Sequence, residues 1–110
     1  GFLDIRLLVS YGADVIERYF RDGSHYGVSI QYYKEDSPKG TAGALLDILP
    51  NLDDFFVVLY GDTFFDVNLR NISSFHQANN ADVTLFVHPN DHPYDSDLVE
   101  LNDDQIMSPD

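Results

Sequence analysis

Short apolar runs of strand type alternate along the chain with segments of helical periodicity, and this alternation restricts the fold more than any other feature. Strands are predicted at residues 5–11, 28–33, 55–60, 82–87 and 98–101, and helices at residues 13–20, 42–49 and 71–79. Strands joined through helices form right-handed crossovers. The pattern therefore predicts an α/β fold, a Rossmann-like three-layer α/β/α arrangement with a mostly parallel sheet.

The most apolar run, Phe-Phe-Val-Val-Leu-Tyr at residues 55–60, ends abruptly in Gly61-Asp62. Ligands of open α/β sheets bind beyond the carboxyl ends of the strands, where Asp62 would lie. We predict that Asp62 is a metal ligand. The alternative is a structural residue that caps the turn after the strand.

A glycine-containing loop opens the helix predicted at residues 42–49. Its sequence is Pro38-Lys39-Gly40-Thr41-Ala42-Gly43. A glycine has no Cβ to block close backbone approach, and the free N–H groups at a helix start favour an anion or a base edge. The pattern predicts nucleotide binding by Pro38, Gly40, Thr41, Ala42 and Gly43. The alternative is a tight strand-to-helix turn with close helix packing.

Residues 33–45, followed by Phe-Val-Val-x-x-Gly-Asp, resemble the sugar-1-phosphate nucleotidyltransferases. The strings Asp22-Gly23-Ser24, Gly27-Val28 and Phe75-His76 also fit this family. The resemblance implies that a sugar-1-phosphate oxygen attacks the α-phosphorus of a nucleoside triphosphate, which gives a nucleotide sugar and pyrophosphate. It also implies Mg²⁺ at Asp62.

Several parts of the family pattern are not found in these 110 residues: the glycine-rich loop with its arginine, the lysine that follows, and a second metal-binding carboxylate. The resemblance therefore implies that residues 1–110 are the central part of one nucleotidyltransferase domain, inactive in isolation. Two other interpretations remain open. One is a non-catalytic regulatory or binding domain of the same fold, and the other is an unrelated α/β domain such as a metal-dependent glycosyltransferase or a phospho-acceptor.

Glu35 stands where the resembling uridylyl- and thymidylyltransferases carry glutamine, and this difference bears on the nucleotide. Guanine presents two adjacent donors, N1–H and the 2-amino group, and an ionised carboxylate has two acceptor oxygens. We therefore predict that Glu35 binds the base and that the nucleotide is GTP. The alternative is a solvent-facing acid before a proline turn.

The stretch at residues 88–100 bears on the sugar substrate. It is similar to the corresponding stretch of family members that act on D-glycero-D-manno-heptose 1-phosphate in bacterial surface-glycan synthesis. Mannose 1-phosphate is the second candidate.

Other clusters of polar residues have weaker patterns. Asp95-Ser96-Asp97 matches the D-x-D metal motif of some glycosyltransferases but follows a polar loop, so a solvated turn is favoured. Asp66, four residues beyond Asp62, is a better candidate than this motif for a position near the metal but outside its direct ligands.

The four histidines are expected to have structural roles. Proline directly after both His88 and His92 prevents the helix that would bring them to one zinc ion, so a turn-rich loop is favoured. His76 is expected to be a half-buried packing residue of its helix, and His25 to lie in a turn.

The net charge of the chain limits the kinds of partner that it can bind. Nineteen acidic residues against six Lys+Arg give a net charge of -13, which repels nucleic acid and anionic membranes. The chain has no cysteine and no apolar run long enough for a membrane span. We therefore expect a cytoplasmic protein without nucleic-acid or membrane partners. The sequence makes no prediction of the oligomeric state.

Overall fold

The computed structural model describes residues 2–89, 91, 94, 98–103 and 105–106. The chain forms two compact units, residues 1–65 and residues 66–110, and each is described by itself. Among the described helices, none combines the length and the apolar character that a membrane span requires.

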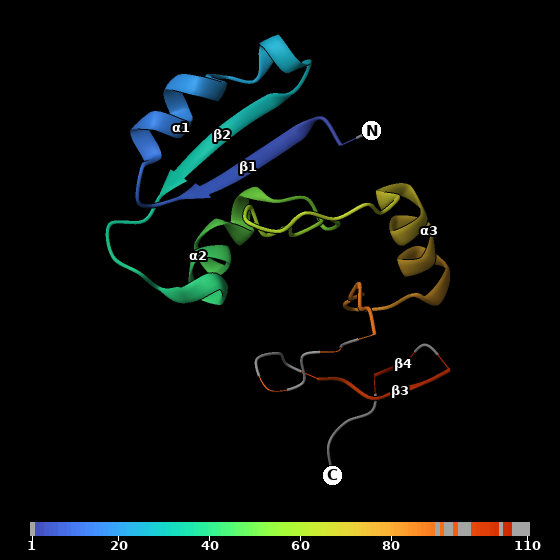
Figure 1. Cartoon of the computed structure of the whole chain (residues 1–110). Coiled ribbons are helices and arrows are strands. Elements are labelled where there is room, and N and C mark those ends of the chain that lie inside the picture. The colour runs from blue at the N-terminus through green and yellow to red at the C-terminus, as the bar shows by residue number, and fades with distance from the viewer. Residues whose placement is uncertain (1, 90, 92–93, 95–97, 104, 107–110) are drawn as a thin grey trace. The chain divides into compact units, whose positions relative to one another are not determined.

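A parallel βαβ crossover forms the first part of the N-terminal unit. Strand β1 (Asp4–Val9) leads through helix α1 (Ala13–Phe20) and the 3₁₀ turn η1 (Ser24–Tyr26) to strand β2 (Ser29–Lys34), as Figure 1 shows. The strands pair in parallel, from Asp4 opposite Ser29 to Val9 opposite Lys34. This crossover confirms the predicted α/β class and two of the predicted strands.

Helix α1 and the turn after it pack against β2. The phenolic O–H of Tyr32 donates to the carbonyl oxygen of Arg21 at 2.5 Å, and the N–H of Ile30 donates to the carbonyl oxygen of Asp22 at 2.8 Å. The Asp22 carboxylate accepts hydrogen bonds from both the N–H and the hydroxyl of Ser24, and these lower the pKa of Asp22. The segment after α1 is thus held along β2 by backbone and side-chain hydrogen bonds.

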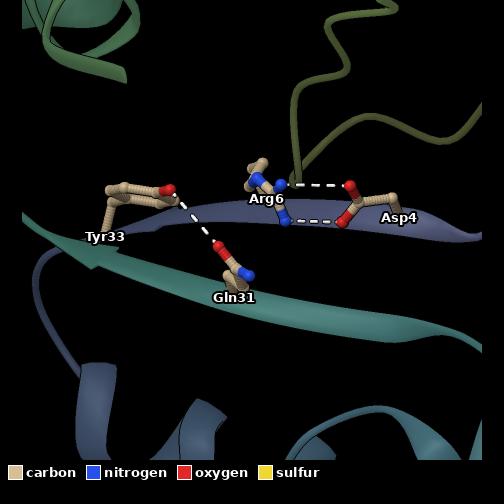
Figure 2. A network of polar contacts seen from close by, with 4 residues as sticks. All are labelled: Asp4, Arg6, Gln31 and Tyr33. Atoms are coloured by element: carbon tan, nitrogen blue, oxygen red, sulfur yellow. Dashed lines mark hydrogen bonds and ion pairs between the residues drawn. The ribbon is translucent and has the colours of Figure 1, made fainter. Parts of the chain in front are cut away.

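Polar side chains lie together on the β1–β2 pair (Figure 2). The Arg6 guanidinium binds both carboxylate oxygens of Asp4, and Arg6 stands opposite Gln31 in the parallel register. On β2 the Tyr33 hydroxyl donates to Oε1 of Gln31 at 3.4 Å. The Nε atom of Arg6 is buried and has no hydrogen-bond partner among the described residues. The strands therefore do not show the uninterrupted apolar character that is typical of a sheet buried on both faces.

Helix α2 (Gly40–Ile48) follows the loop after β2, and the 3₁₀ turn η2 (Leu49–Asn51), which contains Pro50, follows directly. Ala44 and Ile48 are buried, with 6% and 4% of their surface exposed. Their spacing of four residues places them on one face of the helix. The predicted helix at residues 42–49 is confirmed, with its start two residues earlier at Gly40.

The C-terminal unit contains helix α3 (Leu69–Asn79) and the antiparallel pair β3 (Leu101–Asn102) and β4 (Gln105–Ile106). The Asn68 side chain accepts from the N–H groups of Arg70 and Asn71 at 3.0 and 3.3 Å, which begins the helix. Asn80, with a φ of 50°, ends it in the left-handed conformation. The predicted helix at residues 71–79 is confirmed and begins two residues earlier.

The strand predictions for residues 55–60 and 82–87 were wrong. Both segments have irregular backbone, and of the strand predicted at residues 98–101 only Leu101 is in a strand. A strand is defined by its backbone pairing, and the described residues provide no paired neighbour for these segments. Their apolar side chains remain partly exposed, including Val58 at 48%, Leu59 at 51% and Tyr60 at 60%.

Two glycines on either side of η1 provide a matched test of its packing. Gly23 and Gly27 both have positive φ, 82° and 72°. A Cβ on Gly23 would lie 2.6 Å from Cγ1 of Ile30 and 2.9 Å from the carbonyl oxygen of Val28, whereas a Cβ on Gly27 would meet nothing within 4 Å.

We therefore expect Gly23→Ala to destabilise the protein more than Gly27→Ala. Both substitutions add the left-handed penalty of about 1–2 kcal/mol. Only Gly23→Ala adds an overpacking cost of roughly 1–3 kcal/mol. Urea unfolding of the two variants measures the difference, and equal losses would contradict the close packing of Gly23 on β2.

Candidate nucleotide-binding site

Glu35 is held directly after β2 by its backbone. Its N–H donates to the carbonyl oxygen of Val9 at 2.9 Å, which extends the contact between the two strands by one residue beyond Lys34. Glu35 is half-buried, whereas the neighbouring Asp36 is exposed. Glu35 therefore stands at the carboxyl end of the parallel pair, the edge at which ligands of such sheets bind.

The Glu35 side chain folds back on the loop that it begins. Its Oε1 atom accepts a hydrogen bond from the backbone N–H of Lys39 at 3.3 Å. The described residues place no hydrogen-bond donor on the other carboxylate oxygen, Oε2. Glu35 is thus oriented by its own loop while it keeps acceptor capacity.

Helix α2 begins immediately after this hydrogen bond. Lys39 is the residue before the helix, and no side chain caps the helix start. The first four N–H groups of an α-helix have no partner within the helix, so those of residues 40–43 lack partners within α2. Pro38, Gly40 and Ala42 are exposed at this start. The structure therefore brings Glu35 and the predicted nucleotide-binding loop together on one short segment.

The two glycines of the loop serve different purposes in the structure. Gly40 has a φ of 70° and open space around its missing Cβ, so it permits the left-handed turn into the helix. A Cβ on Gly43 would lie 2.7 Å from Cβ of Lys39. Gly43 thus leaves room for the side chain of Lys39, which supports the packing alternative at this position. Close approach of a nucleotide to either glycine stays a prediction.

Lys39 and Asp47 form an ion pair that the sequence analysis did not identify. The Lys39 ammonium lies 2.5 Å from Oδ2 of Asp47, and each side chain is about half exposed. Hydrogen bonding and charge attraction from Asp47 raise the pKa of Lys39. Lys39, Gly43 and Asp47 follow one another at intervals of four residues, which would have indicated that they share one side of a helix.

Asp62 lies in a turn that follows residues 55–60. The N–H of Thr63 donates to the carbonyl oxygen of Tyr60 at 3.3 Å, and Asp62 is exposed. Within the described part of the chain, no three acidic or histidine side chains gather as a metal site. A carboxylate suits Mg²⁺, which accepts one or two protein carboxylates and completes its octahedron with water and phosphate oxygens. Asp62 fits this role as a single ligand, and metal binding stays a prediction.

The other polar clusters do not form a second site in the described residues. Asp95-Ser96-Asp97 and His92 lie outside them. Nδ1 of His88 lies 2.8 Å from the carbonyl oxygen of Pro89, and Asp66 is exposed.

The remaining histidines have structural surroundings. His76 is half-buried, and its Nδ1 lies 2.8 Å from the hydroxyl of Thr84, which joins α3 to the segment after it. His76 is therefore half-buried, as predicted. The ring of His25 lies edge-on to Tyr26, with centroids 5.6 Å apart.

Comparison with known proteins identifies the family. The family model described as nucleotidyl transferase matches residues 1–107. A mannose-1-phosphate guanylyltransferase of Mycobacterium tuberculosis is 37% identical over 86 residues, which cover 77% of this chain and 24% of that protein. A D-glycero-alpha-D-manno-heptose 1-phosphate guanylyltransferase of Campylobacter jejuni is 40% identical over 72 residues, 66% of this chain and 32% of that protein.

A UTP–glucose-1-phosphate uridylyltransferase of Synechocystis is similarly related, at 38% identity over 97 residues that cover 77% of this chain and 25% of that protein. No solved structure matched the chain. The chain thus spans 24–32% of the length of these relatives. Since the family model covers nearly all of its 110 residues, the chain belongs to the nucleotidyl transferase family.

Proposed function

We propose that the full-length enzyme transfers a guanylyl group from GTP to a sugar 1-phosphate of the heptose or mannose type. The observation that carries this proposal is the Glu35 carboxylate, held at the carboxyl end of β2 by the N–H of Lys39. Two of the relatives are named as guanylyltransferases of mannose 1-phosphate and heptose 1-phosphate, which supports the same assignment. Uridylyltransferases also occur among the relatives, which makes UTP the competing nucleotide.

In the proposed reaction an oxygen of the sugar 1-phosphate attacks the α-phosphorus of GTP. A new phosphorus–oxygen bond forms, the bond from the α-phosphorus to the bridging oxygen breaks, and pyrophosphate leaves with the bonding electrons. No protein nucleophile is required, so the enzyme acts by aligning the two reactants and stabilising charge. The product is a GDP-sugar.

Glu35 would select the base. Guanine offers N1–H and the 2-amino group side by side, and the two oxygens of Glu35 can accept both donors because the Lys39 N–H occupies only part of the capacity of Oε1. Uracil presents a carbonyl oxygen beside its N–H, and this oxygen would face a carboxylate without a donor between them. Base discrimination would therefore arise from charge and donor pattern rather than from shape.

Asp62 would hold Mg²⁺ on its exposed carboxylate. When bound, the ion would neutralise phosphate charge beside the reacting phosphorus. The family resemblance implies that a second carboxylate and basic residues complete such a site. These groups are not among the motifs found in residues 1–110.

We propose that the reaction takes place in the cytoplasm, where its nucleotide substrate is made, and that the product serves bacterial surface-glycan synthesis.

A substrate panel tests the proposed reaction directly. The full-length enzyme is assayed for pyrophosphate release with GTP, UTP or dTTP and with heptose, mannose or glucose 1-phosphate. We expect the highest kcat/KM for GTP with heptose or mannose 1-phosphate. A preference for UTP with glucose 1-phosphate would contradict the assignment.

We expect Glu35→Gln to lower kcat/KM for GTP and to narrow its advantage over UTP and dTTP. An unpaired polar group at a buried base edge costs roughly 1–3 kcal/mol, which corresponds to about tenfold to a hundredfold in discrimination. Asp36→Asn is the matched control, since it removes the adjacent exposed charge. Equal GTP kcat/KM in Glu35→Gln and the unmodified enzyme would show that Glu35 does not bind the base.

We expect Asp62→Asn to remove the magnesium-dependent rate while the circular dichroism spectrum is unchanged. A metal ion supplies several kcal/mol of charge stabilisation, so the loss should be about a hundredfold or more in kcat. Asp54→Asn, which alters an exposed acid on the other side of residues 55–60, is the control. If kcat and its dependence on magnesium survive in Asp62→Asn, Asp62 has a structural role.

A further inference from the structure

Lys39 is the basic residue of the proposed nucleotide loop, and its position within the loop limits what its charge can do. Its ammonium is held by Asp47 at 2.5 Å, eight residues further along the chain. A phosphate that approached this ammonium would also meet the negative charge of Asp47, which offsets the attraction. The contacts of Lys39 therefore point to a role other than binding the triphosphate.

The backbone of Lys39 connects this ion pair to Glu35. The N–H of Lys39 is the donor to Oε1 of Glu35, at 3.3 Å. The backbone N–H of Glu35 is itself fixed to Val9 at 2.9 Å. Glu35 is thus held at its main chain by β1 and at its side chain by Lys39.

Gly43 makes this arrangement sterically possible. The Cβ of Lys39 lies only 2.7 Å from the position that a Cβ on residue 43 would occupy. Real Cβ atoms do not approach each other this closely, so any larger residue at 43 would displace Lys39. Lys39, the residue before α2, therefore forms one packed unit with Gly43 and Asp47 of the helix.

We propose that Lys39 is a positioning residue for base selection, and that its ion pair with Asp47 across Gly43 fixes the N–H that orients the Glu35 carboxylate. This proposal rests on the proposed function, in which Glu35 binds guanine. The unit would hold the two carboxylate oxygens toward the donors of the base before the nucleotide arrives. Such preorganisation favours the matching base without adding a contact to it.

The proposal makes a prediction about selectivity rather than overall rate. We expect Lys39→Met and Asp47→Asn each to lower the ratio of kcat/KM for GTP to kcat/KM for UTP by about twofold to fivefold, the range open to an exposed ion pair. Because both substitutions break the same pair, the double variant should be no worse than either single variant. Lys39→Arg keeps the charge and should retain most of the ratio.

A second exposed ion pair provides the control. The Lys34 ammonium lies 3.9 Å from Oδ1 of Asp14. Lys34 comes directly before Glu35 and is part of neither the nucleotide loop nor the candidate metal site. Lys34→Met removes one positive charge from almost the same place in the sequence. We expect it to leave the GTP to UTP ratio unchanged.

The outcomes separate the roles. If Lys39→Met lowers kcat/KM equally for GTP and UTP while Asp47→Asn raises both, Lys39 binds the triphosphate and the proposal is overturned. An unchanged ratio in Lys39→Met also overturns it, while the guanylyl transfer itself stands. If the unmodified enzyme does not favour GTP, or Glu35→Gln leaves its preference intact, base selection by Glu35 is contradicted. The positioning role of Lys39 is then contradicted as well, because it depends on base selection by Glu35.

Discussion

The parallel pairing of β1 with β2 is the interaction on which the candidate site depends. Each backbone hydrogen bond along the pair fixes the next residue, and the last one joins the Glu35 N–H to Val9. The pairing places the main chain of Glu35 at the carboxyl end of the sheet, before the loop that leads to α2 at Gly40, and the N–H of Lys39 orients its carboxylate.

The negative charge of the chain limits which part of the nucleotide the loop at residues 35–43 can bind. The chain has a net charge of -13, and Arg6, Lys34 and Lys39 each lie within 4.0 Å of a carboxylate. The neighbouring carboxylates therefore offset part of the attraction that these three side chains would exert on a triphosphate. What the loop offers is a carboxylate that accepts hydrogen bonds and the N–H groups of a helix start, which suit a base edge. In our account residues 35–43 contribute selectivity for the nucleotide, and neutralisation of its phosphates depends on metal and on further cations.

Local patterns predicted the elements whose formation depends on neighbours in sequence. Helix α1 spans the residues 13–20 that the helical periodicity predicts, and α2 and α3 begin only two residues earlier than expected. The apolar run at residues 55–60 was wrongly predicted as a strand because composition reports burial, whereas a strand requires a pairing partner that can be distant in the chain. The Lys39–Asp47 pair was missed for another reason. Close ligand approach and helix packing both explain a glycine at residue 43, and neither explanation identifies its contact with Lys39.

The central claim is that Glu35 binds the guanine base, and a crystal structure of the full-length enzyme with bound GTP tests it most directly. The account predicts both Glu35 oxygens within hydrogen-bond distance of guanine N1 and the 2-amino nitrogen, at about 2.7–3.2 Å. It also predicts that the Lys39 ammonium remains on Asp47 and that the Lys39 N–H remains on Glu35. A guanine bound elsewhere, with Glu35 turned to solvent and Lys39 on a phosphate, would contradict it.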